Sequence, residues 1–195
     1  MQEQKTNEQM AEDVAELLKQ LKIKDADFFG YSMGGTVALG IGIRHSELVR
    51  RLAVYGSCAG SPKDTYEPET YKQYQSLTAD FSPKELKEPY DKIAPDPTRW
   101  PVLVTKIKNM GRDFKGYSAV ELKSIKAQVL IMMGDRDVVR PEHAVEMYRL
   151  IPNAQLAIFP GGDHFMLWNS PDKVLATLMP FLAAPMPEQK KPNEK

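Results

Sequence analysis

The sequence predicts an α/β domain built on a parallel sheet of about four strands flanked by helices. Four short apolar stretches, around residues 26–30, 51–55, 128–133 and 155–159, have the length and composition of buried strands. Helical stretches separate them, which is typical of parallel βαβ units. The chain has 195 residues, 42% of them hydrophobic, which is enough for a sizeable core.

The first expected element is a helix that begins near Thr6. Thr6 and Gln9 have the spacing of a capping box, in which two side chains satisfy free N–H groups of the first helical turn. An apolar stripe at helical spacing follows, formed by Val14, Leu17, Leu18 and Leu21. The first strand then follows at residues 26–30.

A long insert, residues 61–126, separates the second and third strands. It is rich in Pro, Tyr and Lys and shows helical patches rather than strand alternation. Ser82 followed by Pro83 predicts a helix start. A second helix is indicated by an apolar repeat at Trp100, Leu103, Ile107 and Met110.

The last two strands are each followed by a predicted helix, one over residues 140–148 and one from Ser170 or Asp172 to Leu182. Residues 185–195 are rich in Pro and Lys, and we expect them to form a disordered tail. The chain is therefore divided into a core (1–60 and 127–184), a helical insert (61–126) and this tail.

The run Gly30-Tyr31-Ser32-Met33-Gly34 lies between the first strand and the helix after it. In a nucleophile elbow, a serine on a tight strand-to-helix turn presents its hydroxyl at the edge of the sheet. The glycines suit a turn where the helix packs closely on the strand. The motif alone fits equally well a glycine-rich turn with an incidental serine.

Two further polar groups follow strands, which strengthens the case for a catalytic serine. A serine hydroxyl needs a histidine to take its proton, and the histidine needs a carboxylate to orient it. Asp135 and Asp137 come after the third strand, and His164 comes after the fourth. The order serine, acid, histidine is the one used in this architecture. All three loops fall at the same edge of a parallel sheet.

Together these motifs resemble the α/β-hydrolases of the bacterial esterase and haloperoxidase-like kind. The resemblance rests on Phe28–Gly35, Gly134–Asp137 and Gly162–Trp168, and it covers residues 9–182. It implies that Ser32 is the nucleophile, His164 the base and Asp137 the acid, because the acid is the last residue of the family's G-x-x-D pattern. Asp135 is then a turn residue. The backbone N–H of Met33 is implied as an oxyanion donor.

The resemblance also implies that the chain is shortened at its N-terminus. Nothing before residue 9 resembles the first four strands, their first helix, or the loop that supplies a second oxyanion donor. The strand at 26–29 would then be an edge with free backbone groups, and such an edge favours pairing with another chain. We expect a homo-oligomer formed through this edge, and catalysis weakened by the missing donor.

The remaining candidate residues have simpler interpretations. His45 and His143 are expected at the surface, at the end and the start of helices. Asp163 adjoins His164, but no second histidine has a metal-ligand spacing, so no metal site is expected. Cys58, the single cysteine of the sequence, is expected to be a small core residue.

Composition narrows the partners and the compartment. Lys plus Arg and Asp plus Glu number 26 each, so no basic surface for nucleic acid or an anionic membrane is expected. No apolar stretch approaches membrane length, and the N-terminus is polar rather than signal-like. With a single cysteine, the default compartment is cytoplasmic.

Two functions fit these observations. The first is a cofactor-free serine hydrolase that cleaves small carboxylic esters through an acyl-enzyme. The second is a shortened, catalytically weak relative that acts as an assembly or binding module. The family resemblance implies that the helical insert is a cap over the active site, with pocket candidates at Tyr66, Tyr71, Tyr74 and Trp100. The alternative is a pair of helices that only packs on the core.

Overall fold

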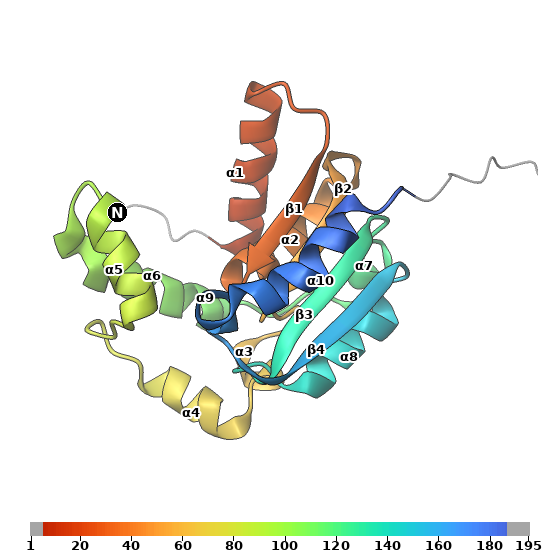
Figure 1. Ribbon diagram of the computed structural model, residues 1–195. Helices are drawn as coiled ribbons and strands as arrows, with labels where there is room; N and C mark the ends of the chain where they lie inside the picture. Colours follow the sequence, from red (N-terminus) through yellow and green to blue (C-terminus); the bar gives the residue numbers. More distant parts are fainter. Residues whose placement is uncertain (1–5, 187–195) are drawn as a thin grey trace, which may run out of the picture.

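The computed structural model describes residues 6–186, which form an α/β fold around a parallel four-stranded sheet. The strands are β1 (Ala26–Tyr31), β2 (Val49–Tyr55), β3 (Gln128–Arg136) and β4 (Ala154–Asp163). They pair in the order β1-β2-β3-β4, every pair parallel (Figure 1). The predicted fold class and all four strands are confirmed.

Helices cover both faces of this sheet, as the near-continuous apolar strands require. On one face lie α1 (Asn7–Gln20), α2 (Met33–Arg44), α7 (Ala119–Lys123) and α8 (Pro141–Leu150). On the other lie α9 (Met166–Asn169) and α10 (Pro171–Ala183) (Figure 1). Successive strand residues alternate between the two cores: Leu52 and Val54 face the first, whereas Ala53 and Tyr55 face the second.

Strand β1, which carries the serine motif, is an edge of the described sheet, as expected. It pairs with β2 on one side, and Phe29 is 41% exposed. Helix α1 packs on α2 through Ala11 and Ala15. Of the apolar stripe predicted for α1, Leu17 and Leu21 are exposed, whereas Val14 and Leu18 are partly buried and Val14 packs against the core.

The N-terminus of α1 is capped differently from the prediction. The Thr6 hydroxyl accepts a hydrogen bond from the Gln9 N–H at 3.1 Å, as a capping box requires. The Gln9 amide instead donates to Asp13, one turn further along the helix. The reciprocal bond of the predicted capping box is therefore absent, and Thr6 acts as a single N-cap.

The regular elements of the predicted insert are all helices. It contains α3 (Pro62–Thr65), α4 (Pro68–Ser76), α5 (Lys84–Ile93) and α6 (Trp100–Asp113), followed by α7. Short 3₁₀ turns occupy Ser46–Leu48, before β2, and Pro97–Arg99. Helix α5 begins at Lys84 with Pro83 as its N-cap, one residue later than predicted. Isolated bridges Gly60–Gly116 and Tyr66–Val139 tie the insert to the core.

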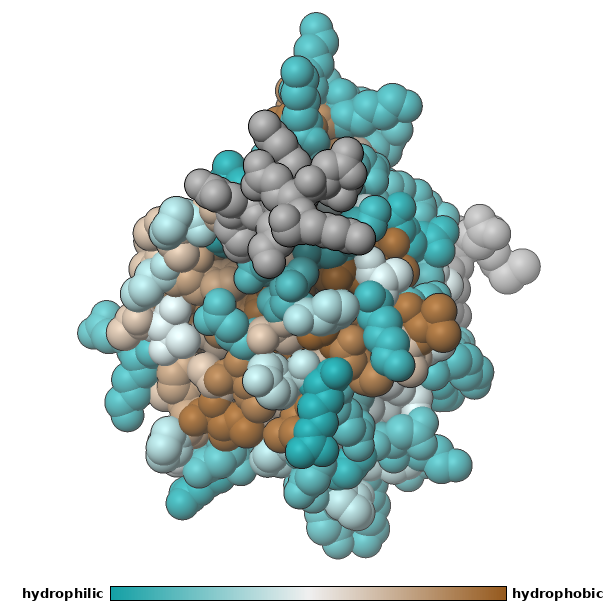
Figure 2. Space-filling model, turned by 90° about the vertical axis from the view of Figure 1, so that its right-hand side faces the viewer, coloured by the Kyte–Doolittle hydropathy of each residue, from teal (hydrophilic) through white to brown (hydrophobic). Residues whose placement is uncertain are grey.

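Strand β4 forms the second edge of the described sheet. Its residues Leu156–Phe159 are only partly buried. Figure 2 shows the side of the molecule on which β4 lies, where charged and polar side chains break the apolar surface into small areas. Within residues 6–186, no helix combines the length and the apolar character needed to cross a bilayer. The predicted tail lies outside the described residues from residue 187 onward.

Candidate active site

Ser32 occupies a strained turn between β1 and α2. Its backbone has φ 52° and ψ −125°, a conformation that a non-glycine residue rarely adopts and that costs of order 1–3 kcal/mol. The Ser32 N–H donates to the carbonyl of Tyr55 on β2 at 2.8 Å, which holds the turn. Because Ser32 is the N-cap of α2, its side chain lies at the positive end of that helix. This is the geometry of a nucleophile elbow.

Two glycines make this turn feasible. A Cβ on Gly30 would lie 2.5 Å from the Gly34 carbonyl oxygen, and one on Gly35 would lie 1.9 Å from the Ser57 Oγ. A Cβ on Gly34 would meet no atom within 4 Å. The expectation that the motif's glycines lack room thus holds for Gly30 but is wrong for Gly34. The close approach involves Gly35, the residue after the motif.

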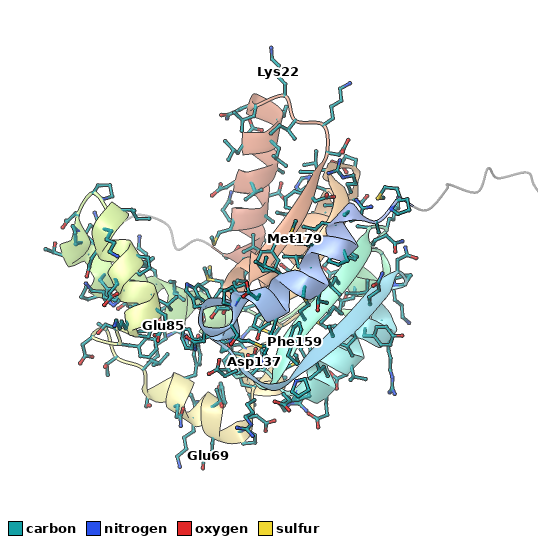
Figure 3. The ribbon with its side chains drawn as sticks, viewed as in Figure 1. Lys22, Glu69, Glu85, Asp137, Phe159 and Met179 are labelled. Carbon is teal, nitrogen blue, oxygen red and sulfur yellow. The ribbon has the colours of Figure 1, made fainter. Side chains whose placement is uncertain are left out.

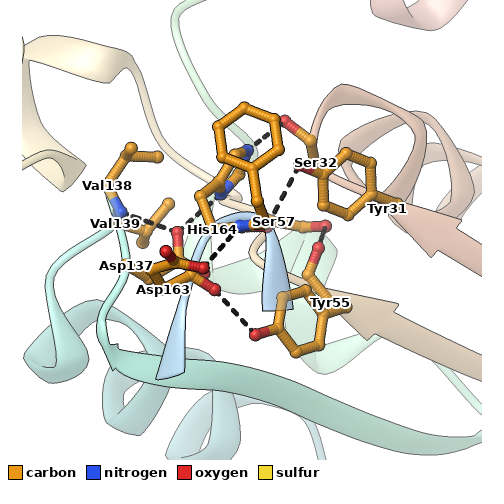
Figure 4. A network of polar contacts seen from close by, with 10 residues as sticks. Tyr31, Ser32, Tyr55, Ser57, Asp137, Val138, Val139, Asp163 and His164 are labelled. Carbon is orange, nitrogen blue, oxygen red and sulfur yellow. Dashed lines mark hydrogen bonds and ion pairs between the residues drawn. The ribbon is translucent and has the colours of Figure 1, made fainter. Parts of the chain in front are cut away.

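Ser32, His164 and Asp137 form one hydrogen-bonded chain (Figure 4). The imidazole Nε2 of His164 lies 3.0 Å from the Ser32 Oγ, and its Nδ1 lies 2.7 Å from the Asp137 Oδ1. The three residues come from the loops after β1, β4 and β3, whose carboxyl ends meet at one edge of the sheet. The structure therefore brings together the three side chains that the sequence singled out.

The carboxylate of Asp137 is fixed by backbone donors. Its side chain is fully buried, and Oδ1 also accepts from the Val138 N–H at 2.7 Å. The alternative acid, Asp135, is exposed and accepts from the Gly161 N–H at 2.8 Å, so it links the ends of β3 and β4. The structure thus places Asp137, and not Asp135, beside the imidazole.

Two tyrosines, the partly buried Tyr31 and the buried Tyr55, hold the loop that carries His164. The Tyr31 hydroxyl donates to the His164 carbonyl at 3.1 Å, and the Tyr55 hydroxyl donates to the Asp163 carbonyl at 2.9 Å (Figure 4). Burial raises the pKa of both phenols, so they stay neutral donors at physiological pH. The Asp163 carboxylate accepts from the Phe165 N–H, which closes the same turn.

Gly56 brings the loop after β2 against the hydrogen-bonded pair. Its φ is +57°, and a Cβ there would lie 2.9 Å from both the Asp137 Oδ2 and the His164 Nδ1. That Asp137 oxygen is buried and has no hydrogen-bond partner among the described residues. A glycine at this position therefore lets the backbone close over the carboxylate and shield it from water.

A small cavity of about 110 Å³ opens beside Ser32. The core contributes its floor and the insert contributes its apolar wall, which includes Ile107, Met110 and Phe114. Of the four aromatic residues predicted for the pocket, Tyr66 and Tyr74 line it. Tyr71 lies outside it, and Trp100 packs against Tyr90 and donates to the Phe81 carbonyl.

A larger hollow lies elsewhere on the molecule, and none of Ser32, Asp137 and His164 lines it. It measures about 760 Å³ and is lined by α1, residues 22–24 and the turn at Ser46–Leu48. Figure 3 shows Lys22, one of its lining residues, at the top of the molecule and well away from Asp137. Ligand sites in open α/β sheets lie at the carboxyl ends of the strands, so the smaller cavity is the relevant one.

The remaining candidate residues take no part in the hydrogen-bonded chain of Ser32, His164 and Asp137. His45 is partly exposed and contacts Glu12 of α1. His143 was expected at the surface, which is wrong: it is buried, and its Nε2 accepts from the Ala59 N–H at 3.0 Å. Cys58 is buried, as predicted. Within residues 6–186, no group of three or more His, Cys, Asp or Glu side chains is arranged to hold a metal ion.

Comparison with known proteins agrees with this geometry. Residues 6–177 match the model of the alpha/beta hydrolase family. The chain belongs to the α/β-hydrolase family. This confirms the resemblance that its three motifs predict.

The relatives of this α/β-hydrolase include differently named enzymes. A 2-hydroxymuconate semialdehyde hydrolase from Pseudomonas putida is 25% identical over 189 residues, covering 86% of this chain and 66% of that protein. A pimeloyl-(acyl-carrier protein) methyl ester esterase from Nitrosospira multiformis is 22% identical over 200 residues, covering 88% of this chain and 74% of that protein. The matches thus span only part of each relative's length, as expected from the sequence.

A solved structure supports the fold assignment. MGS-M2, an α/β-hydrolase from a deep-sea metagenome library of the Medee basin, superposes with a TM-score of 0.71 at 17% identity. The match covers 98% of this chain and 77% of that one. At this identity, the likeness is one of fold.

Several residues of this α/β-hydrolase site were not singled out from the sequence. Gly35, Gly56 and the Tyr31 hydroxyl act through contacts with residues distant in the chain. The one local signal is the position of Gly56, directly after a strand. Asn7, which also lines the cavity, looks in the sequence like an ordinary first-turn residue of α1.

Proposed function

We propose that this α/β-hydrolase cleaves small carboxylic esters through a Ser32–His164–Asp137 triad. The observation that carries the proposal is the continuous hydrogen-bonded chain from the Ser32 Oγ through His164 to Asp137, with contacts of 3.0 and 2.7 Å. Nucleophile, base and orienting acid in this arrangement are what acyl transfer requires.

The reaction proceeds in two halves. In the first, the Ser32 Oγ attacks the ester carbonyl carbon while its proton passes to the His164 Nε2. The tetrahedral intermediate then expels the alcohol, which takes the proton from His164 and leaves an acyl group on Ser32. In the second half, His164 removes a proton from water, and the resulting attack releases the carboxylic acid and restores Ser32.

The surroundings of the triad support specific roles for its members. Asp137 accepts a hydrogen bond from the His164 Nδ1–H, which leaves Nε2 free to take the serine proton. Met33 is the first residue of α2, so its N–H has no partner within the helix and is available to an oxyanion. No cofactor has a role in this sequence of steps.

The dimensions of the cavity support a small acyl group. Pockets for drug-sized ligands measure about 300–1,000 Å³, whereas the cavity at Ser32 holds about 110 Å³. Its apolar wall suits short alkyl chains. The esterase named among the relatives supports an ester substrate, although the semialdehyde hydrolase shows that named activities in the family differ.

Hydrolysis of p-nitrophenyl acetate and p-nitrophenyl butyrate tests the proposal, with Ser32→Ala as the control. We expect turnover of both esters by the wild-type protein and only background release of nitrophenolate by the variant. Equal rates for the two proteins would exclude the triad and favour the alternative of a binding or assembly module.

A further inference from the structure

The cavity at Ser32 contains a buried polar side chain that the mechanism above does not use. Asn7, the first residue of α1, is 4% exposed and lines this cavity together with Ser32 and Met33. Its Oδ1 is buried without a hydrogen-bond partner in the described part of the chain. Leaving such a group unpaired costs about 1–3 kcal/mol, so its retention calls for an explanation.

The cavity lies where two helices begin. Helix α2 starts at Met33 and helix α1 starts at Asn7, and both residues line the space. Each helix N-terminus carries a partial positive charge and unpaired N–H groups. The two together make the cavity favourable for an oxygen atom that develops negative charge.

Other polar side chains of the cavity are already engaged. The Thr36 hydroxyl donates to the Cys58 carbonyl at 2.7 Å, and the Tyr74 hydroxyl donates to the Lys108 carbonyl at 2.7 Å. Among the described residues that line the cavity, the Asn7 amide and the Tyr66 hydroxyl are the remaining N–H and O–H side-chain donors, apart from the serine itself. An amide presents two N–H donors, and rotation about its Cβ–Cγ bond brings either end to the cavity.

We infer that Asn7 is a catalytic residue that donates a side-chain hydrogen bond to the oxyanion, beside the Met33 N–H. The inference rests on the function proposed above. A tetrahedral intermediate is typically held by two donors, and a side-chain amide serves as one in other serine hydrolases. Asn7 is favoured over Tyr66 because its buried Oδ1 has no hydrogen-bond partner among the described residues and because it begins a 14-residue helix whose positive end meets the cavity.

Steady-state kinetics with p-nitrophenyl acetate test this role. Asn7→Leu keeps the side-chain volume but removes both donors, so we expect kcat to fall about a hundred- to a thousandfold. KM should change by much less, because the lost bond forms mainly in the transition state. The Tm should equal or exceed that of the wild type, because an unpaired polar group is removed.

Two controls separate catalysis from helix stability. Thr6→Ala removes the N-cap of the same helix, so we expect a lower Tm with kcat unchanged. Asn7→Asp is nearly isosteric and favourable at a helix start, but its carboxylate cannot donate. It should fold and lose kcat at least as severely, which keeps the test valid if Asn7→Leu does not fold.

The results that overturn the inference are distinct. Retention of wild-type kcat by Asn7→Leu or Asn7→Asp removes Asn7 from the oxyanion site. A large loss of kcat in Tyr66→Phe, with Asn7 variants fully active, assigns the donor to Tyr66 instead. If the wild-type protein itself shows no Ser32-dependent turnover, the proposed function fails and the role of Asn7 fails with it.

Discussion

Gly56 lies so close to His164 that a methyl group on the glycine would stand 2.9 Å from the imidazole Nδ1. The same methyl group would lie 2.9 Å from the Asp137 Oδ2. The hydrogen bond between Asp137 and His164 therefore depends on Gly56, a residue of the loop after β2 that takes no part in the chemistry. Backbone packing, rather than the triad alone, determines whether the site can form.

Gly56→Ala should abolish most activity by displacing this pair. At φ +57°, an alanine also adds about 1–2 kcal/mol of backbone strain. The matched control is Gly161→Ala, which has a similar φ of +68° but open space around its Cβ. We expect a comparable strain cost in both, measured by chemical denaturation, and a large loss of kcat/KM in Gly56→Ala alone. Equal activity in the two variants would contradict this account.

The elbow makes unequal demands on its glycines. Gly35→Ala would force a Cβ into Ser57, so we expect misfolding or a loss of several kcal/mol of unfolding free energy. Gly34→Ala meets no atom and lies in a helix, so its unfolding free energy should change by less than about 1 kcal/mol. Urea denaturation compares them. A Gly34→Ala variant as unstable as Gly35→Ala would show that the turn is packed differently.

The two aspartates at the end of β3, Asp135 and Asp137, should differ sharply in catalysis. Asp137→Asn removes the acceptor that fixes the imidazole tautomer, and kcat should fall by about 10⁴. Asp135→Asn changes an exposed contact between the ends of β3 and β4 and should alter kcat little. Both variants are measured with p-nitrophenyl butyrate. The opposite order of effects would make Asp135 the acid.

His143 should make stability depend on pH. Burial lowers its pKa below the usual 6.5, although the bond to Glu146 opposes this. Above about pH 6.5, the His143 imidazole is neutral in both the folded and the unfolded chain. As the pH falls below this value, the imidazole of the unfolded chain takes up a proton before that of the folded chain does. Stability should therefore fall as pH decreases through about 6.5, by at most about 1.4 kcal/mol per pH unit.

The His143→Gln variant isolates this contribution. Glutamine can still accept from the Ala59 N–H but does not titrate. Unfolding free energies measured at pH 7.5 and pH 5.5 should decrease less in the variant than in the wild type. An identical decrease in both proteins would show that His143 does not titrate differently in the folded state.

The free edge of β1 should mediate self-association. Within the described sheet β1 is paired on one side only, and such an edge with an exposed Phe29 favours pairing with a second copy, as the sequence predicts. Light scattering should give about twice the chain mass of 22.0 kDa. Phe29→Lys should yield monomers, whereas Val120→Lys, at another exposed apolar position, should not. A monomeric wild-type protein would refute the prediction.

The fold and the three polar residues could be predicted because they depend on local patterns. Each of Ser32, Asp137 and His164 follows an apolar strand, and parallel strands end at one edge. The choice between Asp135 and Asp137 needed the family pattern, since both occupy one turn. Their positions in the structure agree with that choice.

The predictions that the structure contradicts concern contacts between residues that are distant in the chain. His143 begins a helix and looks exposed, but it is covered by the loop after β2, whose Ala59 lies 84 positions earlier in the chain. The leucines of α1 look like a core stripe, yet the small residues Ala11 and Ala15 make the close contact instead. No local periodicity encodes which face of a helix meets a neighbour, or where a loop will pass.

The most direct test of the account is covalent labelling of the nucleophile. A fluorophosphonate reacts with a serine only when a base activates its hydroxyl, and peptide mass spectrometry locates the adduct. We predict a single phosphonylated site at Ser32, lost in His164→Ala and retained in Thr6→Ala. Absence of label, or label on another serine with Ser32 unmodified, would contradict the proposed triad.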